Sequence, residues 1–276
     1  MEIIENKRFD EERALYGREE ITVKKCRFDG PRDGESAFKE SARVSAEGCY
    51  FNLRYPFWHC ENVRIVDSEM TGLCRAALWY TRDATLERTL MHGIKALREC
   101  DGVKISECDI RSPEFGWRSR NIDVIDTAAA GEYFMFEARG IKLKNLALDG
   151  KYSFQYVEGG IIEDSVLNTK DAFWHAKDVT VRDSVINGEY LGWYSENLTL
   201  ERCIIKGTQP FCYCRGLKLV DCRMEGCDLS FEKSEVEAAV LSEIDSVKNP
   251  KHGRICAKGY KEIILDVKTE CELLTF

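Results

Sequence analysis

The sequence repeats itself about every 19 residues along most of its length. Five clear copies, which start at Val103, Ile122, Val179, Leu198 and Leu217, read VKISECDI, IDVIDTAA, VTVRDSVI, LTLERCII and LKLVDCRM. Further copies start at Ile21, Val44, Val63, Ala84, Ile141, Gly160 and Val236, and from Ala84 to Val236 every step is 19 residues. Such a period indicates a solenoid, in which each repeat packs only on its neighbours.

The pattern inside each copy predicts strands and corners. With the first residue of a copy as position 0, apolar or small residues fall at positions 0, 2, 5 and 7. Steps of two are typical of strands, and the step of three marks a bend. Gly, Asn or Asp often precedes position 0, as turns require, and Gly is frequent at position 9. A third strand is expected near positions 12 to 16.

Three strands in 19 residues leave no room for a helix, so equivalent strands must pair in parallel at about 4.8 Å. The inward pattern does not recur every five or six residues, which disfavours pentapeptide and left-handed hexapeptide solenoids. We therefore predict an all-β, single-stranded, right-handed parallel β-helix of about twelve coils. One domain spans residues 1–276, with coils at 21–241. Residues 1–20 and 242–276, including a polar loop at 246–253, are expected to cap the strand edges.

Charge and cysteine content exclude some classes of function. The net charge is −8, from 48 acidic and 40 basic residues, which argues against a nucleic-acid partner. No apolar run is long enough for a membrane span, and residues 1–13 are too charged for an export signal. With 13 cysteines and no leader, we expect a cytoplasmic protein with reduced thiols.

Three segments resemble a bacterial family known only as a domain of unknown function. They are FWHC (57–60), GEYLGWYSENLTL (188–200) and FEKSEV (231–236), and the resemblance covers nearly the whole chain. It implies a right-handed β-helix of the pectin-lyase-like type. The resemblance brings no catalytic residue with it, and a fold alone does not establish a function.

The third strand carries most of the aromatic residues. Small and apolar residues fill positions 12 and 16, so the same phase predicts that position 14 faces the interior. Position 14 holds Trp58, Trp79, Trp117, Trp174 and Trp193. These would form an internal ladder, although an exposed sugar-binding strip is the alternative. Position 13 should then face outward, and it holds Phe57, Leu78, Leu97, Met135, Phe154, Phe173 and Phe211.

Position 15 should also face outward, and it supplies the candidate site. Its centre would be a catalytic group on consecutive coils: Arg118, Glu137, Tyr156 and His175. Substrate-binding residues would be Glu99 and Tyr194 at the edges, with Phe154 and Phe173 as an apolar floor. Glu99 and Glu137 lie two coils apart, about 9.6 Å, near the separation in inverting glycosidases. Alternatively, Tyr156 and His175 could serve β-elimination while Arg118 holds a uronate.

Plainer interpretations of these residues remain open. Glu99, Arg118 and Glu137 could be a surface ladder of ion pairs, and the apolar strip could bury an interface. The protein could thus bind or cleave an oligosaccharide. It could equally be a non-catalytic scaffold that self-associates or docks a protein through the third-strand face. Whether it is an enzyme stays open.

No cofactor or metal is expected. The acidic residues at position 4, such as Asp164 and Asp183, suit corners better than a calcium site. Cys212 and Cys214 have zinc-like spacing but no second pair. The cysteines at position 5 are expected to be buried and reduced: Cys26, Cys49, Cys108, Cys203 and Cys222.

Overall fold

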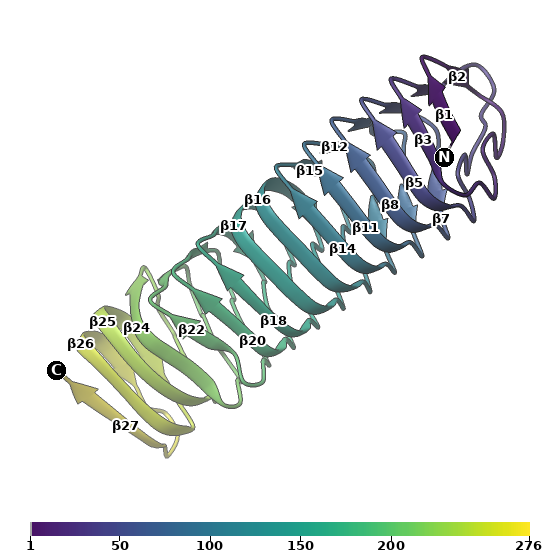
Figure 1. The fold of residues 1–276 in the computed structure, drawn as a ribbon. Helices are drawn as coiled ribbons and strands as arrows, with labels where there is room; N and C mark the ends of the chain where they lie inside the picture. Colours follow the sequence, from purple (N-terminus) through teal and green to yellow (C-terminus); the bar gives the residue numbers. More distant parts are fainter. Residues whose placement is uncertain (1) are drawn as a thin grey trace. The chain divides into compact units, whose positions relative to one another are not determined.

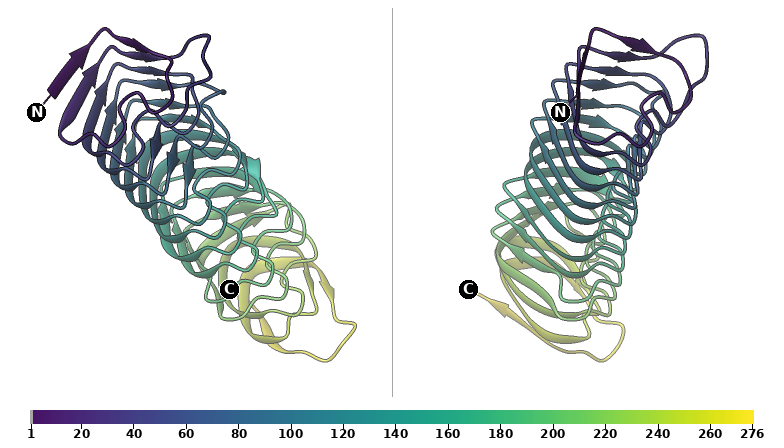
Figure 2. Two further views of the ribbon diagram at one scale, coloured as in Figure 1. Left: turned by 90° about the vertical axis from the view of Figure 1, so that its right-hand side faces the viewer. Right: turned by 45° about the vertical axis from the view of Figure 1, so that its right-hand side comes forward.

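The computed structural model describes residues 2–276, which form an all-β parallel solenoid (Figure 1). It divides into two compact units: the first ends at Lys142 and the second runs from Leu143 to Phe276. Both views of Figure 2 show coils stacked one on the next within each unit. No described segment forms a helix long and apolar enough to cross a membrane.

The first side of unit 1 is a row of parallel strands that pair in chain order. They are β1 (Glu2–Glu5), β3 (Ile21–Lys24), β5 (Ala42–Glu47), β8 (Glu61–Val66), β11 (Arg82–Glu87), β14 (Asp101–Ser106) and β16 (Arg120–Glu132). Val63 pairs with Ala84, Ala84 with Val103, and Val103 with Ile122. The predicted register of position 0 is therefore confirmed.

The other two sides of unit 1 carry shorter strands. The second side consists of β2 (Arg8–Phe9), β4 (Arg27–Phe28), β6 (Tyr50–Phe51), β9 (Glu69–Met70), β12 (Leu90–Met91), β15 (Asp109–Arg111) and the later part of β16. The third side contains three two-residue strands: β7 (Phe57–Trp58), β10 (Leu78–Trp79) and β13 (Leu97–Arg98). The remaining described coils close their third side mainly with turns, so the expected third strand is mostly missing.

Unit 2 continues the same parallel pattern within itself. Its first side consists of β18 (Glu158–Glu163), β20 (Lys177–Arg182), β22 (Thr199–Glu201), β24 (Leu217–Glu225), β25 (Glu235–Lys248), β26 (His252–Ile264) and β27 (Glu270–Thr275). Its second side contains β19 (Val166–Lys170), β21 (Val185–Asn187) and β23 (Ile204–Lys206). Strand β17 (Arg139–Lys151) runs across the unit boundary, and its residues 147–151 pair with β19.

The solenoid has about 14 turns, close to the predicted twelve. The difference arises at the ends, where the segments expected to be caps also pair in parallel. In 1–20 these strands are β1 and β2, and in 242–276 they are the end of β25, β26 and β27. The last coils do not fit the 19-residue repeat because their spacing is shorter. Glu235 pairs with His252 and His252 pairs with Glu270, which are steps of 17 and 18 residues.

Burial follows the repeat on the first two sides. The residues at positions 0, 2, 5 and 7 of one coil, Val103, Ile105, Cys108 and Ile110, are all buried. The predicted corners are also present, since Asn62, Asp83, Asn121, Asp178 and Asn197 have φ between 52° and 56°. Left-handed backbone at this point turns the chain into the next strand.

On the third side, positions 12 and 16 are buried and position 15 faces outward as predicted, but positions 13 and 14 are exchanged. Position 13 is buried, whereas the tryptophans at position 14 are half-buried at the surface. Phe154 and Phe173, expected as an exposed sugar-binding floor, are 0% and 1% exposed, and their rings stack at 4.9 Å in the core. The reason is the backbone: Phe154 and Phe173 have φ near 60°, as do corner residues on either side. Strand alternation does not hold through left-handed residues.

Candidate functional site

A column of four stacked rings lines the third side of unit 2. Tyr156 and His175 have ring centroids 4.8 Å apart, His175 and Tyr194 5.0 Å, and Tyr194 and Tyr213 4.8 Å, all with planes within 9° of parallel. Each ring comes from one coil, at a left-handed corner residue with φ between 54° and 61°. The fold therefore sets the spacing of the column.

Stacking decides which part of each ring meets solvent. Rings packed face to face leave their edges outward, so hydroxyl groups and imidazole nitrogens form the accessible row. Burial lowers the pKa of His175, so its imidazole is neutral at neutral pH. Burial, with the nearby carboxylate of Glu232, raises the pKa of Tyr213, which stays a hydroxyl donor. The row therefore offers neutral hydrogen-bonding groups at the spacing of the coils.

Trp174 and Trp193 stand beside this column rather than inside the core. Their rings stack at 5.3 Å with an interplanar angle of 6°. The indole N–H of Trp174 donates to the carbonyl of Tyr190 at 2.6 Å, and that of Trp193 donates to the carbonyl of Gln209 at 2.8 Å. Each tryptophan is thus fixed to the next coil and presents part of its surface to solvent.

A ladder of charged side chains runs beside the rings, mostly at position 17. Glu196 pairs with Arg215, and Lys177 lies 3.7 Å from the same carboxylate group. Further along, Lys251 donates to Glu235 at 2.6 Å. Alternating signs on consecutive coils were visible in the sequence at 177, 196 and 215, but the pattern was not recognised as part of a site.

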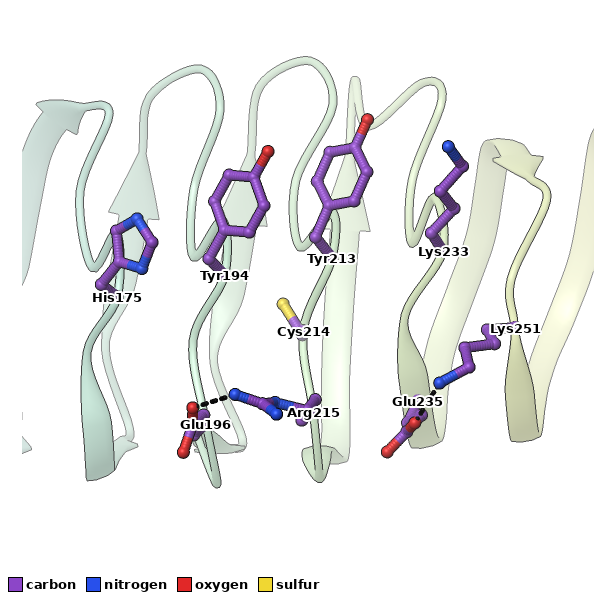
Figure 3. A pocket seen from close by; sticks show the side chains of 9 residues that line it. All are labelled: His175, Tyr194, Glu196, Tyr213, Cys214, Arg215, Lys233, Glu235 and Lys251. Atoms are coloured by element: carbon purple, nitrogen blue, oxygen red, sulfur yellow. Dashed lines mark hydrogen bonds and ion pairs between the residues drawn. The ribbon is translucent and has the colours of Figure 1, made fainter.

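The column and the ladder line a half-open surface cavity of about 330 Å³, at the lower end of the range for ligand pockets. It is lined by His175, Tyr194, Glu196, Tyr213, Cys214, Arg215, Lys233, Glu235 and Lys251 (Figure 3). Cys214 is buried, and burial raises the pKa of its thiol to about 11, so it contributes no thiolate. Lys233 and Glu235 were missed because their own coil carries an extra residue, so that Cys214 meets Ser234 after a 20-residue step. Lys251 was missed because residues 246–253 were expected to form a loop.

The predicted site residues of unit 1 form a separate group. Arg118 Nε donates to Glu137 Oε2 at 2.6 Å, and both side chains are more than a third exposed. Burial opposes ionisation of Glu99, but hydrogen bonds from Tyr80 and Arg98 hold its pKa below the usual value. These contacts are those of a surface ladder of ion pairs.

The structure therefore brings together two subsets of the predicted site. Within unit 1 it pairs Arg118 with Glu137, and within unit 2 it stacks Tyr156, His175 and Tyr194. Phe154 and Phe173 belong to neither subset because they are buried. Among residues 2–276, no group of three or more His, Cys, Asp or Glu side chains is arranged to hold a metal ion.

Comparison with known families gives a clear match. Residues 2–273 match the family described as "Protein of unknown function (DUF3737)". The chain belongs to this family. The resemblance seen in the sequence is thereby confirmed, and no curated protein matches this member of the family.

Among solved structures, the chain is similar to three proteins of different kinds. HetL, a pentapeptide repeat protein from the cyanobacterium Nostoc, shows 12% identity over 80% of this chain and 91% of that one, with a TM-score of 0.31. The periplasmic alginate epimerase AlgG shows 11% identity over 99% and 74%, with a TM-score of 0.31. The Streptococcus pneumoniae adhesin PfbA shows 9% identity over 99% and 88%, with a TM-score of 0.30. Values this low carry no argument about function.

Proposed function

We propose that this DUF3737 protein binds an oligosaccharide at the cavity of unit 2 and does not cleave it. The observation that carries the proposal is the row of exposed ring edges at Tyr156, His175, Tyr194 and Tyr213, spaced 4.8 to 5.0 Å apart. An extended glycan presents hydroxyl groups at a comparable interval along its chain. Successive sugar units can therefore meet successive coils.

The surroundings of the row also suit a sugar. Hydroxyl groups of Tyr194 and Tyr213 point to one side of the cavity, and the ion pairs of Glu196 and Glu235 lie on the other (Figure 3). Carboxylates accept hydrogen bonds from sugar hydroxyls, while tyrosine hydroxyls both donate and accept. Half-buried Trp193 adds an apolar surface next to these polar groups.

Electrostatics favour binding over cleavage. A glycosidase needs one carboxyl group with a raised pKa to act as the acid. Of the two carboxylates that line the cavity, Glu235 has its pKa lowered by the hydrogen bond from Lys251, and Glu196 is held in an ion pair with Arg215. Tyr156 and His175 stack face to face, an arrangement that directs their proton-carrying edges outward rather than toward each other. Neither the two carboxylates of the cavity nor the stacked Tyr156 and His175 are arranged as an acid and a base that exchange a proton.

The test removes two hydroxyl groups and keeps the stack. The double variant Tyr194→Phe with Tyr213→Phe retains both rings, and Tyr55→Phe in unit 1 serves as the matched control. Glycans would be screened on an array and affinities measured by calorimetry. Losing two hydrogen bonds of about 1 kcal/mol each should weaken binding roughly 30-fold while leaving the thermal midpoint nearly unchanged. The proposal fails if no glycan binds at millimolar concentration, or if the double variant binds like the wild type.

Self-association through the same face is the second candidate. It is favoured by the half-buried tryptophans, since Trp58 and Trp79 stack at 5.4 Å in unit 1 and Trp174 and Trp193 at 5.3 Å in unit 2. Aromatic residues are enriched at protein interfaces. Sedimentation velocity decides the matter: a dimer that Trp174→Ala dissociates would replace the oligosaccharide proposal, and a monomer would exclude this one.

A further inference from the structure

We infer that the sugar bound in this cavity carries an anionic group, a carboxylate or a sulfate, and that Lys233 recognises it. The inference rests on the proposed function and deepens it, because it names the class of sugar and the residue that selects it. Three observations support it: the ammonium group of Lys233 has no carboxylate partner, it lies at the end of the ring column, and its donors suit an anion.

The charges that line the cavity do not cancel. Three basic side chains face two acidic ones. Glu196 is paired with Arg215, and Glu235 with Lys251. Lys233 is the basic residue left over, since no carboxylate among residues 2–276 lies within 4.0 Å of its ammonium group. With His175 neutral, the lining has a net charge of one positive unit near neutral pH.

The position of Lys233 continues the column of rings. It sits one coil beyond Tyr213 at a corner with φ of 53°, and its side chain is exposed. Its Nζ lies 5.7 Å from the centroid of the Tyr213 ring, which holds the ammonium by a cation–π contact. Figure 3 shows this ammonium on the same side as the hydroxyls of Tyr194 and Tyr213. A ligand that follows the hydroxyl row therefore reaches the cation at the end of it.

These donors match an anionic sugar unit. An ammonium group with three donors and a neighbouring phenolic hydroxyl can both hydrogen-bond one carboxylate or sulfate. Hydrogen bonds to ionised groups are shorter and stronger than neutral ones, so this contact should dominate selectivity. The protein carries a net charge of −8, which disfavours anions in general. Selection of an anionic sugar must then come from the local arrangement at Lys233.

The experiment compares three sets of probes of equal length: neutral cello-oligosaccharides, oligogalacturonates and sulfated oligosaccharides. Binding to the whole protein would be measured by calorimetry at low and high salt. We expect at least one anionic set to bind tenfold or more tightly than the neutral set, with the preference reduced by salt. Lys233→Gln should abolish this preference while neutral binding remains. Lys218→Gln, an exposed lysine on β24, is the matched control and should behave like the wild type.

Each result has a clear meaning. A preference lost in Lys233→Gln and kept in Lys218→Gln supports the inference, and whether uronates or sulfated sugars show it identifies the anion. Equal binding of neutral and anionic probes would overturn the inference but leave the proposed function standing. A preference that survives in Lys233→Gln would also overturn it. If none of the probes binds, the inference is overturned, and the proposed function falls with it when the glycan array is also negative.

Discussion

Adjacent residues on the third side provide a sharp test of which ring supports the core. Phe173 is 1% exposed and stacks on Phe154 at 4.9 Å, so Phe173→Ala should cost about 3–5 kcal/mol. Trp174 is half-buried, and its larger ring makes one stack and one hydrogen bond. Trp174→Ala should therefore cost only about 1–3 kcal/mol.

Thermal unfolding followed by calorimetry and circular dichroism measures both variants. A loss of about 4 kcal/mol lowers the midpoint by roughly 7 °C if the whole chain unfolds at once, and by roughly twice that if unit 2 unfolds separately. Acrylamide should also quench tryptophan fluorescence in the native protein, because the tryptophans at position 14 reach the surface. A larger loss of unfolding free energy for Trp174→Ala than for Phe173→Ala would refute the burial of position 13. It would instead support the tryptophan core predicted from the sequence.

Three further predictions concern the scaffold. Although burial raises it, hydrogen bonds from two arginines bring the pKa of Asp29 below its usual value. Asp29→Asn should therefore destabilise the protein at pH 7, and urea titrations should show the difference vanishing as pH falls through the folded-state pKa. A Cβ on Gly188 would lie 2.2 Å from the carbonyl oxygen of Thr169, so Gly188→Ala should cost about 1–3 kcal/mol in the same titrations, whereas Gly72→Ala should be nearly neutral. Only one of the 13 thiols, that of Cys256, is not buried, so a thiol reagent should label at most one cysteine rapidly until the protein is denatured.

The first two sides of the coil could be predicted from sequence because they obey one simple rule. Extended residues alternate in and out, so Val103, Ile105 and Ile110 identify themselves as core by spacing alone. The Asn and Asp residues before position 0 also predict the corners, since these residue types tolerate a left-handed backbone. Strand register then follows directly from the 19-residue step.

The third side could not be predicted in the same way because its backbone is not extended. Tyr190 and Tyr194 have φ of 56° and 59°, yet tyrosine gives no sequence signal for a left-handed conformation. Neighbouring coils impose it instead: the N–H of Tyr194 donates to the carbonyl of Cys212 on the following coil. The left-handed conformation thus depends on contacts between coils, and the residue pattern within one coil does not predict it.

The same corners explain why the outward column at position 15 was still found while the residues around it were misassigned. Positions 13 and 15 are both left-handed, yet Phe173 at position 13 turns into the core, whereas His175, Tyr194 and Tyr213 at position 15 reach the surface. Residues two apart therefore do not share a face here, as they would in a strand. The ring edges, and not the buried phenylalanines, then become the part of this side that a ligand can meet. Selectivity must accordingly come from hydroxyl groups and charges at the ring edges, which is why Lys233, at the end of the column, is the residue to substitute first.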